Sequence, residues 1–148
     1  MAFHFTLAPL LRLRQSIERQ RALRLQDASL ALARAQDSFE QLERFLAESA
    51  QSDSVSLSAG CRAADLQFAS VYRENLEQLR EELQSEVRKL ELARQQAATE
   101  YHQALREREV LETIRARQRR DYQKDELRRQ QQQLDAGHLL QRWRHRSG

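Results

Sequence analysis

The side chains that could bind a metal or act as nucleophiles are scattered along the chain. The four histidines are His4, His102, His138 and His145, and none has a cysteine or a carboxylate pair at metal-ligand spacing on one helix face. The single cysteine, Cys61, lacks the neighbouring base and the sheltered pocket that a catalytic thiol needs. One cysteine excludes an internal disulfide and fits a reducing compartment. We therefore expect no enzymatic activity, no metal and no cofactor.

Positive charge is the other candidate for chemistry, and it gathers near both ends of the chain. Residues 101–148 carry 12 basic and 7 acidic side chains, although the whole chain has a net charge of only +3. Near the start, five arginines form a basic cluster in which Glu18 is the only acidic residue before Asp27. They are Arg12, Arg14, Arg19, Arg21 and Arg24. Such clusters could bind the phosphates of a nucleic acid or an acidic protein surface.

A nucleic acid is the less favoured of these two partners. Acidic residues alternate with the arginines over residues 106–135, and Tyr122 is the only aromatic residue there. Base stacking on this stretch would therefore be poor. We expect no nucleic-acid partner, while an Arg-rich helical nucleic-acid-binding protein stays the alternative from another class.

The composition indicates long helices rather than a compact globule. The chain has 3 Gly, 1 Pro, 32% charged residues and only 6% aromatic residues, which is typical of a coiled coil. Its N-terminus does not resemble a signal peptide, and no run approaches the ~20 apolar residues that cross a bilayer. We expect a cytosolic protein.

A first helix is predicted over about residues 6–48. Thr6 can act as its N-cap, Pro9 falls in its first turn, and Phe5 and Leu10 occupy hydrophobic-staple positions. Further along, apolar residues recur at alternating spacings of three and four, the a and d positions of a heptad. These residues are Leu25, Ala28, Leu32, Ala35, Phe39, Leu42 and Leu46.

A second, longer helix is predicted over about 61–136, after a Ser-rich hinge at about 49–60. The hinge is expected because Ser and Asp side chains compete with a helix for backbone hydrogen bonds. At the other end of the second helix, Gly137 offers a C-cap before a basic tail, 137–148, that contains Trp143. The apolar a and d residues of this second helix are Ala69, Tyr72, Leu76, Leu79, Leu83, Val87, Leu90, Ala93, Ala97, Tyr101, Ala104 and Leu111.

The predicted fold is all-α: an antiparallel two-helix coiled-coil hairpin with a longer, overhanging C-terminal helix, in a single elongated domain, 1–148. Pairing outward from the hinge sets Leu46 opposite about Leu66, and the start of the first helix opposite about residue 105. Because the two helices satisfy each other, we expect a monomer or weak self-association.

Aromatic residues gather around the hinge-proximal third of this hairpin. Phe39 and Tyr72 occupy a or d positions, which favours packing between the helices. Phe45 and Phe68 lie off these positions, where a ring on a two-helix structure is hard to bury. For these two, a partner surface is as good an interpretation as packing.

Three segments of the sequence resemble one known family. FHFTLAPLLRLRQ near the N-terminus, YRENLEQLREEL after the Ser-rich stretch, and YHQALREREVLETIRARQRRDYQKDELRRQQQQLD near the C-terminus together resemble the flagellar export proteins of the FliJ family. The resemblance covers the chain from Phe3 to about Asp135. A similar coiled-coil stalk of a virulence type III secretion system is the nearest alternative.

The resemblance implies a non-enzymatic stalk of the flagellar type III protein export apparatus. Its expected partners are a hexameric export ATPase, whose ring it enters and promotes, the cytoplasmic domain of the export gate, and export chaperones. Through them it would be peripheral at the inner membrane. The residues expected to contact the ATPase ring are Phe5, Leu10, Leu11, Arg12, Arg14, Arg108, Arg115, Arg119 and Arg120. Those expected to contact the export gate are Phe39, Leu42, Phe45, Phe68, Tyr72 and Leu76.

Overall fold

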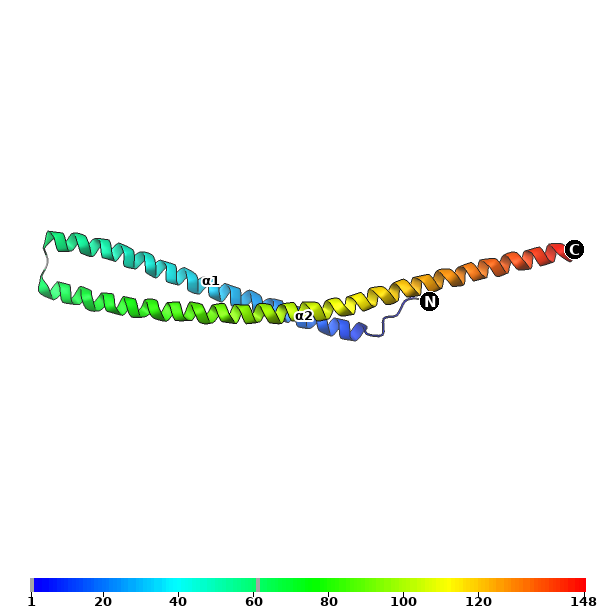
Figure 1. Cartoon of the computed structure of the whole chain (residues 1–148), viewed down its shortest axis with the longest axis horizontal. Helices are drawn as coiled ribbons and strands as arrows, with labels where there is room; N and C mark the ends of the chain where they lie inside the picture. The colour runs from blue at the N-terminus through cyan, green and yellow to red at the C-terminus, as the bar shows by residue number, and fades with distance from the viewer. Residues whose placement is uncertain (1, 61) are drawn as a thin grey trace. The chain divides into compact units, whose positions relative to one another are not determined.

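The computed structural model describes residues 2–60 and 62–148, which form two α-helices. Helix α1 spans Ala8–Ala59 and α2 spans Ala63–Arg146, and no strand occurs among the described residues. The two helices pack against each other as a hairpin (Figure 1). The predicted all-α hairpin is confirmed.

Helix α1 begins within two residues of its predicted start. The Leu7 carbonyl accepts the first helical hydrogen bond, from the Leu11 N–H at 2.9 Å, so Leu7 rather than Thr6 is the N-cap. Pro9 lies in the first turn, where its missing N–H costs no hydrogen bond. Phe5 is buried together with Leu11, whereas Leu10 is exposed, so the predicted Phe5–Leu10 staple was wrong by one residue.

The predicted Ser-rich hinge at 49–60 is wrong, because α1 stays helical to Ala59. The hydroxyl of Ser54 donates to the Gln51 carbonyl at 2.8 Å, and that of Ser58 to the Val55 carbonyl at 2.7 Å. These serines satisfy their polar groups on the preceding turn of the same helix and so do not disrupt it.

Gly60 ends α1 in the left-handed region of the backbone. Its φ is 83°, and its N–H donates to the Leu57 carbonyl at 3.3 Å, as expected for a glycine just past a helix C-terminus. Two residues later the Arg62 carbonyl accepts from the Leu66 N–H at 3.2 Å, which starts α2. Asp65 lies in the first turn of α2, where a negative charge favours the helix dipole.

Helix α2 does not end at about residue 136, as predicted, but continues through Gly137 to Arg146. Gly137 is not at a positive φ and therefore does not act as a C-cap. One glycine inside a helix costs only about 1 kcal/mol relative to alanine. Arg144, His145 and Arg146 in the last turn favour the negative end of the helix dipole.

The chain divides into two compact units. The turn unit is Arg19–His102, and the terminal unit combines the residues up to Glu18 with Gln103–Gly148. Both helices run through both units without a break, and the single domain over 1–148 stays a prediction.

In the turn unit, α1 and α2 lie antiparallel on either side of the turn (Figure 1). All seven predicted a and d residues of α1 are buried or half-buried, with Leu32 the most buried at 7% exposure. On α2 the predicted pattern holds at Leu83, Val87 and Leu90, but Leu79 and Ala93 are exposed.

Ion pairs between the helices set the register of the turn unit. Arg80 contacts Glu43 at 2.5 Å, Arg21 contacts Glu100 at 2.8 Å, and Arg73 pairs with Asp53. Leu46 lines a groove together with Leu76. The predicted pairing of Leu46 with Leu66 was therefore wrong, since the connection is much shorter than the hinge on which that count relied.

The two glycines near the ends of the helices predict opposite responses to alanine. Gly60→Ala should lower stability by about 1 kcal/mol, because a Cβ is strained at positive φ. Gly137→Ala should instead raise the helix content of α2, since a Cβ there meets nothing within 4 Å. Thermal melts followed by far-ultraviolet circular dichroism measure both. Destabilisation by Gly137→Ala would contradict a continuous α2.

Candidate functional site

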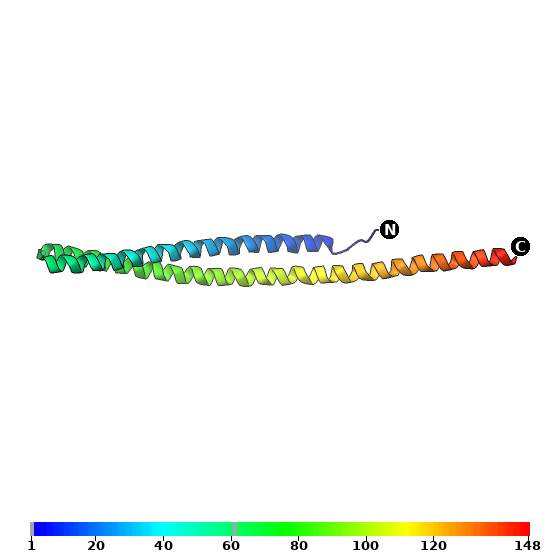
Figure 2. The same ribbon diagram turned by 90° about the horizontal axis from the view of Figure 1, so that it is seen from above.

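The terminal unit holds an apolar cluster between the start of the chain and the middle of α2. Phe5, Leu11 and Leu111 are 5%, 4% and 8% exposed, and Phe3, Ala8 and Ile114 pack against them. Phe3 also meets Tyr122, with ring centroids 5.7 Å apart. Figure 2 shows the N-terminal residues beside α2. The α2 face that we predicted to be uncovered from about residue 105 is therefore covered as far as Tyr122.

Charged side chains pair across the helices next to this cluster. Arg14 pairs with Glu107, and Arg108 pairs with Glu18 and also donates through Nη1 to Glu112 Oε2 at 2.6 Å. The side chains of Arg108 and Glu18 are only 20% and 18% exposed, the least exposed of the ion pairs among the described residues.

The neighbouring carboxylates favour the charged form of Arg108 further. The hydrogen bond to Glu112 raises the pKa of Arg108 above its ordinary value, and the charges of Glu112 and Glu18 add to this. A group whose pKa is raised on folding adds its full stabilisation at every pH below its unfolded pKa. The contribution of Arg108 is therefore complete throughout the neutral range and is lost only at extreme alkaline pH. Arg108 is therefore a fixed charge.

The arginines that follow on α2 are different. Arg115, Arg117, Arg119 and Arg120 are all exposed, and the ion pairs of the described residues include none of them. On the facing segment Arg12 is likewise exposed. This stretch presents exposed positive charge that makes no ion pair among the described residues.

The residues predicted to contact an ATPase ring thus fall into two groups. Four are engaged inside the terminal unit, two in the apolar cluster and two in ion pairs: Phe5, Leu11, Arg14 and Arg108. The remaining five are exposed: Leu10, Arg12, Arg115, Arg119 and Arg120. Only the exposed group has side chains available to a partner.

The residues predicted to contact an export gate all lie in the turn unit. Phe39, Leu42 and Leu76 are half-buried between the helices. Phe45, Phe68 and Tyr72 are 45%, 76% and 46% exposed. The rings of Phe68 and Tyr72 stack in parallel with centroids 6.4 Å apart.

Two groups of exposed apolar side chains were assigned no contact from the sequence. Near the turn these are Val55, Leu57 and Val71, and near the C-terminus they are Leu139 and Leu140, beside the Trp143 already noted in the tail. The first group lies in or beside the stretch read as a hinge, and the second in the stretch read as a tail. A helical-wheel projection continued through both stretches would have found them.

Other sites find no support in the described residues. Among them no group of three or more His, Cys, Asp or Glu side chains is arranged to hold a metal ion, and no helical stretch is apolar and long enough to span a membrane. Cys61 lies outside the described residues.

Comparison with protein families identifies the chain. The family model described as "Flagellar FliJ protein" matches residues 3–148. The chain belongs to the FliJ family. Membership makes it a component of the flagellar type III export apparatus. The FliJ family is a non-catalytic, cytoplasmic part of that apparatus. No curated protein and no solved structure matches the chain.

The apolar cluster predicts a large difference between two adjacent residues. Leu111→Ala should lower the free energy of unfolding by about 2–4 kcal/mol, because Leu111 fills the contact with Phe5 and Leu11. Val110→Ala, at a side chain 58% exposed, should change it by less than about 0.5 kcal/mol. Denaturant titrations provide both values. Equal effects would mean that the N-terminal segment does not pack on α2.

Proposed function

We propose that this FliJ-family chain is a non-catalytic stalk that enters the central opening of the hexameric export ATPase and links the ring to the export gate. The observation that carries the ring contact is the group of exposed arginines on α2 that make no ion pair among the described residues, Arg115, Arg119 and Arg120. Arg115 directly follows Ile114 of the apolar cluster, and Arg119 and Arg120 lie before Tyr122, whose ring Phe3 contacts. We assign the ring contact to this basic stretch.

The surface of α2 beyond the basic stretch supports insertion into a ring. From Leu127 to the C-terminus every described residue is exposed, and the side chains as far as Asp135 are mostly Gln, Arg and Asp. With only Leu127 and Leu134 apolar as far as Asp135, this surface has no continuous apolar stripe for self-association, and it would meet a ring lining through hydrogen bonds and charge. This polar surface would keep the long unpaired part of α2 soluble until it binds the ring.

The chemistry of the ring lining follows from the charge of the stalk. Exposed guanidinium groups suit an acidic or carbonyl-rich collar, and such contacts speed association and set orientation more than they add affinity. Stimulation of the ATPase should therefore weaken as salt shortens the Debye length from ~30 Å at 0.01 M to ~10 Å at 0.1 M. The stalk itself contributes no catalytic group.

The export gate would bind the turn unit. Phe68, Val71 and Tyr72 follow one another at i, i+3 and i+4, so they share one face of α2, and they are 76%, 57% and 46% exposed. Contiguous exposed apolar surface with aromatic residues is typical of a protein interface. The predicted contacts at Phe39, Leu42 and Leu76 would support this face from between the helices. Export chaperones are further proposed partners, without a surface assigned to them.

Reversing the charge of the basic stretch tests the ring contact. The triple variant Arg115→Glu, Arg119→Glu, Arg120→Glu should bind the ATPase at least about tenfold more weakly and lose stimulation of ATP hydrolysis, because like charges then face each other. Its helix signal should persist, since these side chains make no ion pair that holds the described fold. Titration of ATPase activity with the protein gives both values.

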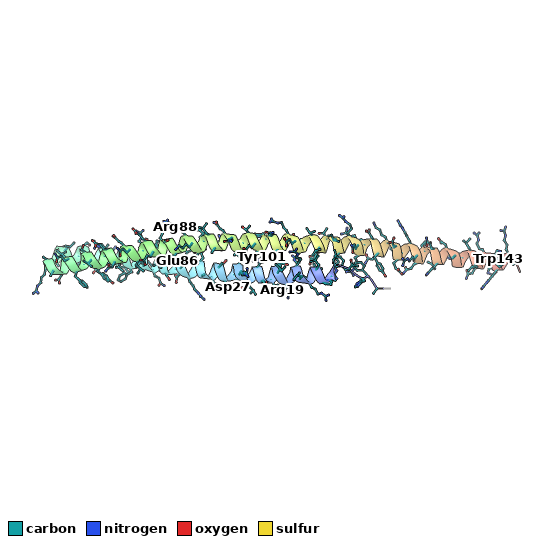
Figure 3. The ribbon with its side chains drawn as sticks, turned by 90° about the horizontal axis from the view of Figure 1, so that it is seen from below. Arg19, Asp27, Glu86, Arg88, Tyr101 and Trp143 are labelled. Carbon is teal, nitrogen blue, oxygen red and sulfur yellow. The ribbon has the colours of Figure 1, made fainter. Side chains whose placement is uncertain are left out.

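A second triple variant controls for net charge. Arg34→Glu, Arg88→Glu, Lys89→Glu changes the charge equally at exposed positions of the turn unit; Arg88 points away from the helix pair in Figure 3. It should stimulate the ATPase as the natural chain does. Full stimulation by the Arg115, Arg119 and Arg120 variant would refute the assignment.

Removing one exposed ring tests the gate contact. Phe68→Ala should weaken binding to the cytoplasmic domain of the export gate by about tenfold, as expected for a central aromatic residue. Because Phe68 is 76% exposed, the free energy of unfolding should change by less than about 0.5 kcal/mol. Leu92→Ala, at another exposed apolar side chain of α2, should leave gate binding unchanged. Calorimetric titrations that find equal binding for all three chains would disprove the contact.

A further inference from the structure

The last helical turns of α2 combine positive charge with an apolar face. Residues 136–148, the C-terminal segment, contain Arg142, Arg144 and Arg146 and no Asp or Glu. The segment is helical as far as Arg146 and lies in a part of the chain where every described residue is exposed. Figure 3 shows Trp143 near the end of α2 with no other helix beside it.

The large apolar side chains of this segment share one side of the helix. Leu139, Leu140 and Trp143 are 67%, 59% and 69% exposed. At ~100° per residue they fall within an arc of ~100°. In the same projection Arg142 and Arg146 flank this arc on one side and Arg144 flanks it on the other. Basic residues at a helix C-terminus favour the helix dipole by themselves, but the dipole does not account for the apolar arc between them.

We propose that the C-terminal segment binds the surface of an anionic lipid bilayer. Trp143, Leu139 and Leu140 would enter the boundary between headgroups and acyl chains, where tryptophan and leucine of interfacial helices lie. The flanking arginines would reach the lipid phosphates on either side while their aliphatic stems stay along the apolar arc. Residues 136–148 contain three arginines and no acidic residue, so their charge complements an anionic surface.

A lipid surface suits this segment better than a groove on a protein. A helix that docks in a groove carries apolar residues over several turns, at i, i+3, i+4 and i+7. Upstream of Leu139 the same face presents Ala136, Gln132 and Gln133, so the apolar arc lasts only about two turns. A short apolar arc lets this segment insert shallowly into the bilayer surface, while the polar residues upstream of Leu139 stay in water.

This contact goes beyond the proposed function, in which the membrane is reached only through partner proteins. Arg120 and Leu139 are separated by ~28 Å along α2, at 1.5 Å per residue. The basic stretch and the C-terminal segment can therefore be altered independently, and a failure of one assignment leaves the other standing.

Trp143 is the only tryptophan of the chain, so its fluorescence reports on this segment alone. The full chain should be mixed with vesicles of phosphatidylcholine containing phosphatidylglycerol, and with vesicles of phosphatidylcholine alone. We expect the emission maximum to move to shorter wavelength and quenching by acrylamide to fall at least about twofold on the anionic vesicles. Pure phosphatidylcholine and free inorganic phosphate should cause neither change.

Two variants separate charge from apolar contact. The triple variant Arg142→Gln, Arg144→Gln, Arg146→Gln should lower partitioning onto anionic vesicles by about a hundredfold in co-sedimentation. Leu139→Gln with Leu140→Gln should also lower it, with the net charge unchanged and Trp143 kept as the reporter. Arg115→Gln, Arg119→Gln, Arg120→Gln removes the same charge elsewhere on α2 and should leave the Trp143 response to vesicles intact.

Three results would overturn the proposal. They are no spectral change on anionic vesicles, an equal change on pure phosphatidylcholine, and equal loss of binding in the control that removes Arg115, Arg119 and Arg120. A Trp143 shift that appears with the purified ATPase and not with vesicles would also overturn it, because it would assign the segment to a protein surface.

Discussion

The narrow contact between two helices is the constraint on which the rest of the structure depends. Each helix has one neighbour, so among the described residues only Phe5, Leu11, Leu32, Ala104 and Leu111 are buried, and none is fully enclosed. A contact of this kind cannot specify its own register by shape alone, since heptad positions repeat. The cross-helix ion pairs supply what the apolar residues lack: each aligns one point of α1 with one point of α2.

The periodic part of the fold could be predicted from the sequence, and its boundaries could not. Spacings of three and four over residues 25–46 identify the buried face of α1 correctly, because burial follows the helical period. Residues 49–60 and Gly137 were predicted to interrupt the helices because of their residue types alone. Ser54 and Ser58 are accommodated by bonding to their own helix, and one glycine is too weak a breaker to end a long helix. Misjudging the turn then shifted the whole register.

The candidate site shows the same limit in its side chains. Arg14, Glu18 and Arg21 continue the a and d frame of residues 25–46 toward the N-terminus, and their polarity by itself does not indicate a helix contact. In the structure these residues meet Glu107, Arg108 and Glu100 across the interface. Their role depends on which residues of α2 lie opposite, and this is a property of the register rather than of local sequence. Arg115, Arg119 and Arg120 are exposed although Phe3 reaches Tyr122 beyond them, so their exposure depends on which face of α2 the N-terminal residues cover.

The unpaired end of α2 has a physical logic of its own. Starting a helix is the unfavourable step, whereas each further residue adds a hydrogen bond at little net cost. The packed part of α2 provides that start, so the residues after Glu126 can extend the helix although nothing covers them. Exposed i,i+3 pairs such as Arg129 with Glu126 add little to the stability of this part of the helix. A surface that binds near the last turn therefore stabilises every residue between itself and the packed part. Side chains with large contact area have most effect at the point where the helix is least supported, and Leu139, Leu140 and Trp143 lie there.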